Sequence, residues 1–162
     1  MLLRTLGRER RNVGSVEAGL AEIGQFLGEI GVDAQEVHLL DGSGLSRETQ
    51  VTPRAVVALL KSMYDSKLRA SWIDLLPVAG EDGSLRDRLR SRGVRARIHA
   101  KTGSLEGVVA LAGYVTGADS EPLAFAIFMN HGRIKEPDAR SLIDRIAAEI
   151  AAETATTTQE KR

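Results

Sequence analysis

The sequence predicts an α+β fold in which helices pack with a three-stranded antiparallel meander. Two patterns support this prediction. Apolar residues recur at helical spacing in the first half of the chain and at its C-terminal end. Three strand-like segments follow one another between residues 95 and 130, joined by short links. The 162 residues are enough for one domain with its own core.

The N-terminal region predicts helices. Residues 1–14 are short and basic and are typical of a helix end followed by a loop. Ser15 can cap a second helix that runs to about Ile30, and Gly31 can end it in the left-handed conformation. The apolar residues of this helix share one face: Val16, Leu20, Ile23, Leu27 and Ile30.

An extended apolar segment is expected at residues 37–40, before a Gly/Ser-rich loop at 41–44. Thr52-Pro53 predicts the start of a helix, because threonine is a good cap and proline suits the first helical position. The buried stripe of this helix is expected to contain Val56, Leu59, Leu60 and Met63.

A short helix is expected at residues 70–75, followed by a turn at 80–83. Ser84 is then predicted to cap a helical segment that reaches Arg92 and ends at Gly93.

The three predicted strands are Arg95–Lys101, Val108–Thr116 and Leu123–Asn130. Their links, around residues 103–107 and 117–122, are short and rich in turn residues. Short links join antiparallel neighbours, so the strands are expected to form a meander.

Pro137 opens the last predicted helix. Its apolar face is expected to contain Ala139, Leu142, Ile143, Ile146, Ala147 and Ile150. We expect residues 1–152 to form one domain and residues 153–162, with their run of threonines, to form a disordered tail.

The composition argues against several classes of function. The net charge is zero, which gives no general affinity for nucleic acid or anionic membranes. The absence of cysteine excludes disulfides and thiolate metal sites within the chain. No apolar run approaches the length of a membrane span, and the opening residues do not match a signal peptide.

The most informative short motif is Lys101-Thr102-Gly103-Ser104. A phosphate-binding loop would need a glycine several residues before the Lys-Thr pair and a helix after it, and this sequence has neither. The motif fits the Lys-Thr-Gly strand of penicillin-recognising serine acyl-transfer enzymes. Taken alone, a three-residue match is weak, and an ordinary hairpin entry would be favoured over it.

Three further segments accompany this motif in order. Asp41–Arg47 reads DGSGLSR, Leu76–Leu85 reads LPVAGEDGSL, and Leu111–Tyr114 reads LAGY, while the motif itself lies within the string HAKTGSLEGV. In this order and spacing the segments resemble the class C low-molecular-mass penicillin-binding proteins, which are D-alanyl-D-alanine carboxypeptidases and endopeptidases. The resemblance extends from about Leu2 to the last helix.

The resemblance implies a role for each residue of the motif. Lys101 would help to bind the terminal carboxylate of the peptide and tune the field at the nucleophile, and the Thr102 hydroxyl would contact the same carboxylate. Gly103 would occupy a position at which a larger side chain is not tolerated. The Ser104 backbone N–H would complete the oxyanion hole, where one donor is worth about 3 kcal/mol of barrier. Lys101 and Ser104 are thus the expected catalytic residues.

The resemblance also implies the surroundings of this site. The fold would be the C-terminal part of a serine beta-lactamase/transpeptidase-like domain, and the N-terminal remainder of that domain would be its partner. The substrate would be a peptidoglycan stem peptide ending in D-Ala-D-Ala, and beta-lactams would acylate the same site. No cofactor or metal is expected, and the location would be periplasmic or otherwise extracytoplasmic.

The sequence departs from the family in one respect. Members attack with a serine in a Ser-x-x-Lys motif and also carry a Ser-x-Asn motif, and neither motif occurs in these 162 residues. In the family both motifs lie N-terminal to the matched region. We therefore expect the isolated chain to be inactive, and a non-catalytic remnant that binds a peptide or a partner is the alternative.

The family comparison also concerns the edge of the sheet. In the family, N-terminal strands pair beside the strand that matches Leu123–Asn130. Without them this apolar strand has an unpaired edge, so the isolated chain is expected to be marginally stable or to associate through it.

Other candidate residues are weaker. Ser43 and Ser46 lie in a string that does not match Gly-x-Ser-x-Gly, so a structural loop is favoured over a nucleophile. The three histidines, His38, His99 and His131, lack the spacing of metal ligands. An arginine-rich stretch favours a solvated face, with a positive rim for anionic peptides as the alternative: Arg86, Arg88, Arg90, Arg92, Arg95 and Arg97.

Overall fold

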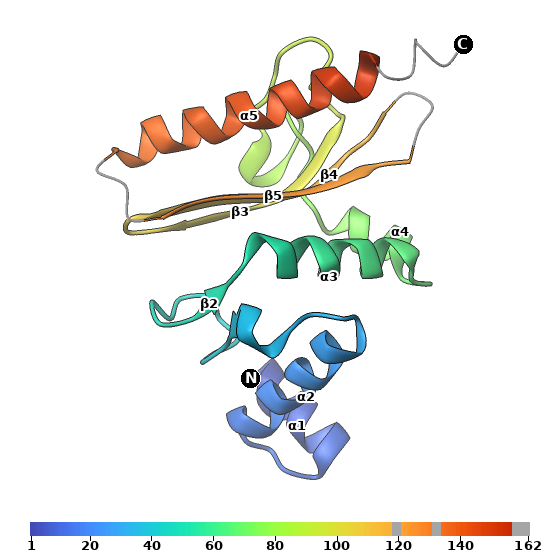
Figure 1. Cartoon of the computed structure of the whole chain (residues 1–162), viewed down its shortest axis with the longest axis vertical. Helices are drawn as coiled ribbons and strands as arrows, with labels where there is room; N and C mark the ends of the chain where they lie inside the picture. Colours follow the sequence, from blue (N-terminus) through green and yellow to red (C-terminus); the bar gives the residue numbers. More distant parts are fainter. Residues whose placement is uncertain (118–120, 131–133, 157–162) are drawn as a thin grey trace. The chain divides into compact units, whose positions relative to one another are not determined.

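The structure is a computed structural model that describes residues 1–117, 121–130 and 134–156. The chain divides into two compact units, Met1–Ser62 and Met63–Arg162, whose elements are labelled in Figure 1. The expectation of one domain over residues 1–152 stays a prediction. None of the helices in the described ranges is both long and apolar enough to cross a membrane.

The first unit begins with two helices, α1 at Leu2–Arg11 and α2 at Val16–Glu29. The cap predicted at Ser15 is confirmed, because its hydroxyl accepts a hydrogen bond of 3.1 Å from the backbone N–H of Ala18. The predicted end is confirmed as well, since Gly31 has a φ of +81°.

The close contact between α1 and α2 depends on glycine. A Cβ atom added to Gly19 of α2 would lie 2.1 Å from the Leu3 carbonyl oxygen of α1. A Cβ atom on Gly7 would lie 2.6 Å from the Val13 carbonyl oxygen. The absence of side chains at these two positions therefore lets the backbones approach each other.

The predicted extended segment is shorter than expected. A 3-10 turn, η1 at Ala34–Glu36, leads into β1 at Val37–His38. This strand pairs antiparallel with β2 at Gln50–Val51, and residues 39–40 lie outside it. The intervening segment contains the Gly/Ser-rich loop.

The helix predicted from Thr52-Pro53 is confirmed as α3, which spans Pro53–Asp65. The Thr52 hydroxyl accepts a 3.1 Å hydrogen bond from the backbone N–H of Ala55 and caps the helix. The expected short helix follows as α4 at Arg69–Asp74.

The meander predicted for the second unit is confirmed. Its strands are β3 at Ile98–Leu105, β4 at Val108–Val115 and β5 at Leu123–Asn130, in the antiparallel order β3-β4-β5. β3 begins later than predicted and continues to Leu105, so the Lys-Thr-Gly-Ser motif lies within the strand. Gly107, with a φ of +77°, completes the tight turn to β4.

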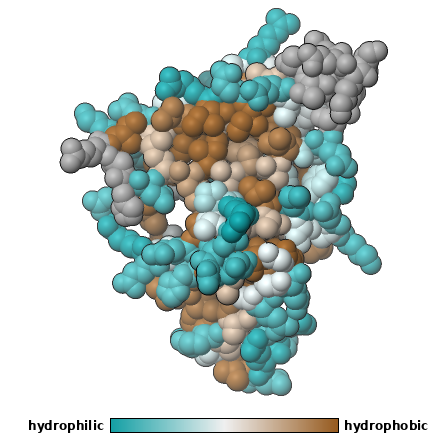
Figure 2. Space-filling model, viewed as in Figure 1, coloured by the Kyte–Doolittle hydropathy of each residue, from teal (hydrophilic) through white to brown (hydrophobic). Residues whose placement is uncertain are grey.

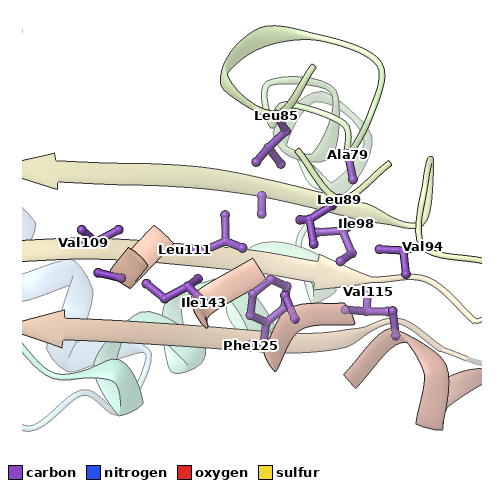
Figure 3. Packing of buried hydrophobic residues seen from close by; sticks show 14 residues of the cluster. Ala79, Leu85, Leu89, Val94, Ile98, Val109, Leu111, Val115, Phe125 and Ile143 are labelled. Atoms are coloured by element: carbon purple, nitrogen blue, oxygen red, sulfur yellow. The ribbon is translucent and has the colours of Figure 1, made fainter. Parts of the chain in front are cut away.

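The last helix, α5 at Glu136–Thr156, packs on one face of the sheet (Figure 1). It extends beyond the expected start of a disordered tail at residue 153, and residues 157–162 lie outside the described ranges. Figure 3 shows how buried side chains of the sheet, α5 and the loop before β3 meet in one core. The core consists of Ala79, Leu85, Leu89, Val94, Ile98, Ala100, Val109, Leu111, Val115, Phe125, Ala139, Ile143, Ala147 and Ala151.

The helical segment predicted from Ser84 to Arg92 is wrong. The structure has only the 3-10 turn η2 at Gly83–Leu85, followed by turns. Leu89 has a φ of +55°, which interrupts any α-helix at that residue. The side chains of Leu85 and Leu89 are buried in the core, so tertiary packing outweighs the local cap signal (Figure 3).

Two arginines of the basic stretch brace the loop before β3. The Arg88 guanidinium donates two hydrogen bonds, of 2.6 and 3.1 Å, to the Asp144 carboxylate of α5. Arg97 donates to the Ala151 carbonyl oxygen near the C-terminal end of α5 at 2.8 Å. Arg86 is exposed. These contacts show structural roles for Arg88 and Arg97, whereas the positive rim stays a prediction.

The helix contact in the first unit can be tested by two alanine substitutions in α2. Gly19→Ala is expected to lower the free energy of unfolding by about 1–3 kcal/mol, because the new methyl group overlaps α1. Gly24→Ala is the matched control: no atom lies within 4 Å of its added Cβ, so the substitution should be neutral or stabilise by up to about 1 kcal/mol. Urea unfolding followed by far-UV circular dichroism measures both, and equal effects would contradict the close contact.

The brace on α5 can be tested by removing one charge at two nearby positions. Arg88→Met is expected to cost about 1.5–3 kcal/mol, because it leaves the partly buried Asp144 carboxylate without its two donors. Arg86→Met removes the same charge from an exposed side chain and should change stability by less than about 0.5 kcal/mol. Thermal unfolding at neutral pH compares them; a negligible effect of Arg88→Met would show that the pair does not stabilise the unit.

Candidate functional site

β3 places the four residues of the motif in alternation on the two faces of the sheet. Thr102 and Ser104 lie on the face covered by α5, the face on which Ile98 and Ala100 are buried. Lys101 and Gly103 lie on the opposite face. The Lys101 side chain is exposed, and its Nζ donates a 2.6 Å hydrogen bond to the Thr102 carbonyl oxygen.

The outer edge of β3 is paired along its first half. Ala79 donates its N–H to the Ile98 carbonyl oxygen, and Ala100 donates to the Pro77 carbonyl oxygen, both at 2.9 Å. Val78 thereby forms an isolated bridge with His99. The segment LPVAG, which belongs to one of the strings that resemble the family, thus covers this half of the edge.

The second half of the same edge is open among the described residues. Backbone groups alternate in direction along a strand, and those of Ala100 point outward to Pro77. The N–H and C=O groups of Thr102 and Ser104 therefore also point outward, toward a side on which no described strand pairs. The Ser104 N–H therefore points away from β4, toward the open side of this edge.

The position of Gly103 is tight. Its cross-strand partner is Ala110, and a Cβ atom added to Gly103 would lie 3.3 Å from the Ala110 Cβ. Ala112 lies opposite Lys101 on the same face. The surface around the lysine stem is therefore lined by small residues.

Two hydroxyl groups connect the motif to neighbouring elements. The Ser104 hydroxyl donates a 2.6 Å hydrogen bond to the Glu136 carboxylate in the first turn of α5. That hydrogen bond, followed by the charge of Arg140, holds the pKa of the Glu136 carboxyl below its ordinary value. The Thr102 hydroxyl donates to the Ser84 hydroxyl at 3.0 Å.

The contribution of Glu136 was not evident from the sequence, and the helix cap predicted at Ser84 is wrong. Glu136 is far from the motif in sequence. Its position in the first turn of a helix, four residues before Arg140, indicates an ion pair with Arg140 but not a contact with Ser104. Ser84 lies in η2 and interacts with Thr102 of β3 instead of capping a helix.

An aromatic cluster lies on the face of the sheet opposite α5. The Trp72 indole Nε1 donates to the Tyr114 hydroxyl at 3.0 Å, and the rings of Tyr64 and Tyr114 are 5.9 Å apart. Burial raises the pKa of the Tyr114 phenol. Tyr114 is also the cross-strand partner of His99, so this cluster anchors the strand just before Lys101.

The loop at residues 41–47 is held by its own side chains. The Ser43 hydroxyl donates to the Asp41 carboxylate, and this hydrogen bond lowers the pKa of the Asp41 carboxyl. The backbone N–H of Leu45 donates to the Ser43 hydroxyl at 3.2 Å, and that of Glu48 donates to Ser46 at 3.3 Å. These local turns fit the predicted structural loop.

The histidines show no metal-binding arrangement in the part of the chain that the structure describes. No group of three or more His, Asp or Glu residues gathers there in a way that could hold a metal ion. His99 lies on β3 and His38 on β1, and His131 falls outside the described residues.

The link between β3 and α5 can be tested through its acid sensitivity. The folded-state pKa of the Glu136 carboxyl lies below its unfolded value, so its contribution to stability is present above pH ~4.3 and is lost as pH falls through the folded-state pKa. Ser104→Ala should therefore raise the pKa of the Glu136 carboxyl, as measured by carbonyl NMR. The difference in free energy of unfolding between wild type and Ser104→Ala should become smaller as the pH falls. Ser141→Ala, on the exposed side of α5, is the control, and an unchanged Glu136 pKa in Ser104→Ala would contradict the hydrogen bond.

A family model described as the D-Ala-D-Ala carboxypeptidase 3 (S13) family matches residues 1–150. The chain is 39% identical over 156 residues to a D-alanyl-D-alanine carboxypeptidase from Actinomadura sp. (strain R39), covering 93% of this chain and 28% of that protein. It is 35% identical over 118 residues to the D-alanyl-D-alanine carboxypeptidase DacB of Haemophilus influenzae, covering 72% of this chain and 25% of that protein.

Comparison with solved structures agrees with these sequence matches. The crystal structure of penicillin binding protein 4 (dacB) from Haemophilus influenzae matches 94% of this chain with a TM-score of 0.80 and 28% identity, and the match covers 35% of that protein. A second structure of the same protein, complexed with a beta-lactam, matches with a TM-score of 0.79 and 28% identity over 94% of this chain and 36% of that one. The α+β prediction is therefore confirmed, and the chain spans about a third or less of these relatives.

Proposed function

The chain belongs to the D-Ala-D-Ala carboxypeptidase 3 (S13) family, and we propose that it forms the substrate-carboxylate and oxyanion side of a serine D-Ala-D-Ala carboxypeptidase active site. The observation that carries this proposal is the open half of the β3 edge, which begins at Lys101. Within four consecutive residues it presents one exposed cation, two hydroxyl-bearing residues and the outward N–H groups of Thr102 and Ser104.

The reaction of such a site is an acyl transfer to water. A serine oxygen attacks the carbonyl carbon between the two D-alanines, and the C–N bond breaks as the terminal D-Ala leaves with a proton. Water then hydrolyses the ester. During attack the carbonyl oxygen becomes an anion, which the outward N–H of Ser104 can stabilise.

Lys101 and Thr102 act on the other end of the substrate. The Lys101 ammonium supplies a positive charge for the terminal carboxylate and for the field at the nucleophile, and the Thr102 hydroxyl adds a hydrogen bond to that carboxylate. In the structure Lys101 donates to the Thr102 carbonyl oxygen and Thr102 donates to Ser84. Both contacts would exchange for contacts with the carboxylate on binding.

The attacking groups come from a segment other than these 162 residues, because no Ser-x-x-Lys or Ser-x-Asn motif occurs in them. The chain would then act with an N-terminal remainder of the same domain, outside the cytoplasm, on peptidoglycan stem peptides that end in D-Ala-D-Ala. Beta-lactams would acylate the completed site. Endopeptidase action on cross-links belongs to the same chemistry.

A second candidate function also follows from the absence of Ser-x-x-Lys and Ser-x-Asn in these 162 residues. If no nucleophile joins this chain, the β3 edge would act as a non-catalytic site for a peptide or a partner. An extended peptide can add to an open strand edge through main-chain hydrogen bonds, without any chemistry.

A chimera tests the proposal. The region of the Actinomadura relative that matches this chain is replaced by the chain, and the product is incubated with a fluorescent penicillin and run on a denaturing gel. We expect a covalent adduct, reduced at least about tenfold by Lys101→Ala because the carboxylate loses its charged partner. Lys135→Ala removes another exposed lysine and should leave the adduct unchanged.

The isolated chain is the companion measurement. It should form no covalent adduct with penicillin. An adduct on this chain alone would overturn the account of the missing nucleophile. A folded chimera that binds a D-Ala-D-Ala peptide but is never acylated would favour the non-catalytic alternative.

A further inference from the structure

We propose that Ser84 is a positioning residue for the substrate carboxylate, which acts by orienting the hydroxyl group of Thr102. The inference rests on the proposed function, because it extends the role given there to Thr102. It also gives a function to the string LPVAGEDGSL at residues 76–85, which otherwise only covers the first half of the β3 edge.

The string reaches the site because it is paired with β3. Its two backbone hydrogen bonds to the strand end at Ala100, two residues before Thr102. The chain then turns away from the strand at residues 80–83 and returns with Ser84, whose hydroxyl accepts a 3.0 Å hydrogen bond from the Thr102 hydroxyl. Ser84 therefore lies where the paired half of the edge gives way to the open half.

The turn before Ser84 is closed by its own hydrogen bonds. The Asp82 carboxylate accepts a 2.7 Å hydrogen bond from the backbone N–H of Val78. The backbone N–H of Gly80 donates to the Leu85 carbonyl oxygen at 3.0 Å. An acidic side chain that accepts from the backbone within a turn holds that turn in one conformation.

Both neighbours of Ser84 are fixed by packing. Gly83 has a φ of +50°, and a Cβ atom added to it would lie 3.1 Å from the Pro77 ring, so a larger residue does not fit there. The Leu85 side chain is fully buried in the core (Figure 3). This core fills the layer between α5 and the sheet, and hydrophobic residues of that layer show in the upper part of Figure 2. The Ser84 hydroxyl is thus presented to Thr102 by a rigid segment.

A pair of hydroxyl groups suits the binding of a carboxylate. An ionised carboxylate only accepts hydrogen bonds, so Thr102 has to turn its proton toward the substrate. A hydroxyl can both donate and accept, so Ser84 can then donate to the Thr102 oxygen. The pair keeps its hydrogen bond and reverses its direction. Without the Ser84 hydroxyl, the Thr102 proton would have to be ordered at each binding event.

The neighbouring hydroxyl of Ser104 is held in a different way. It donates to the Glu136 carboxylate at 2.6 Å, and the same hydrogen bond keeps the pKa of the Glu136 carboxyl below its ordinary value. An ionised carboxylate cannot donate a proton in return. Thr102 and Ser84 therefore form the hydroxyl pair that can turn a proton toward a substrate.

NMR of the full chain tests the contact without any substrate. Three-bond couplings from the Thr102 Cγ2 to its backbone N and C′ report the χ1 angle. We expect values of a single rotamer in wild type and in Ser84→Thr, which keeps the hydroxyl, and averaged values in Ser84→Ala. Ser91→Ala is the matched control, because Ser91 is an exposed serine of the same loop. Thr102 couplings that do not change in Ser84→Ala would overturn the inference.

Acylation of the chimera by benzylpenicillin and by its methyl ester tests the role toward a carboxylate. Ser84→Ala should slow acylation by benzylpenicillin about fivefold, and acylation by the ester, which lacks the carboxylate, by less than about twofold. Ser84→Thr should restore the rate with benzylpenicillin to within about twofold of wild type. In a Thr102→Ala background, Ser84→Ala should have no further effect, since it acts through Thr102.

The outcomes separate this inference from the proposed function. A Ser84→Ala variant that slows both compounds equally, or whose effect adds to that of Thr102→Ala, would show a general structural role and overturn the inference. A chimera that reacts normally with Ser84→Ala would do the same and leave the proposed function intact. If the chimera is not acylated at all, the proposed function fails, and the Thr102 couplings of the full chain still decide whether Ser84 positions Thr102.

Discussion

The backbone pairing of β3 is the constraint on which the candidate site depends. On its inner side the strand pairs with β4 along its whole length, which fixes the face and direction of every side chain from Ile98 to Leu105. On its outer side the segment at 77–79 stops at Ala100. The point at which that pairing ends is also the point at which Lys101 begins the motif, so the same hydrogen bonds hold the strand and leave its edge available.

Elements with local determinants were predicted well. Ser15 and Thr52 act as caps through contacts within three residues, and the short links between strands allow only antiparallel neighbours. The segment after Ser84 was predicted incorrectly, because the burial of Leu85 and Leu89 depends on a core assembled from distant parts of the chain.

In the candidate site, too, local features were predicted from the sequence and long-range contacts were not. The four residues of the motif were identified from the sequence, since they are consecutive and their neighbours resemble one family. The contacts that position them were not, because Glu136, Ser84 and Trp72 reach β3 or its cross-strand partner only through the fold. A single sequence contains no record of such pairs, so the residues of the motif were easier to predict than the residues that position them.

The tight turn at Gly107 has a consequence for how the second unit assembles. β3, β4 and β5 follow one another along the chain, so their pairing closes only short loops and carries a small entropic cost. The braces from Arg88 to Asp144 and from Arg97 to Ala151 span 56 and 54 residues and close much longer ones. Low contact order within the meander favours its early formation, with docking of α5 as the later step.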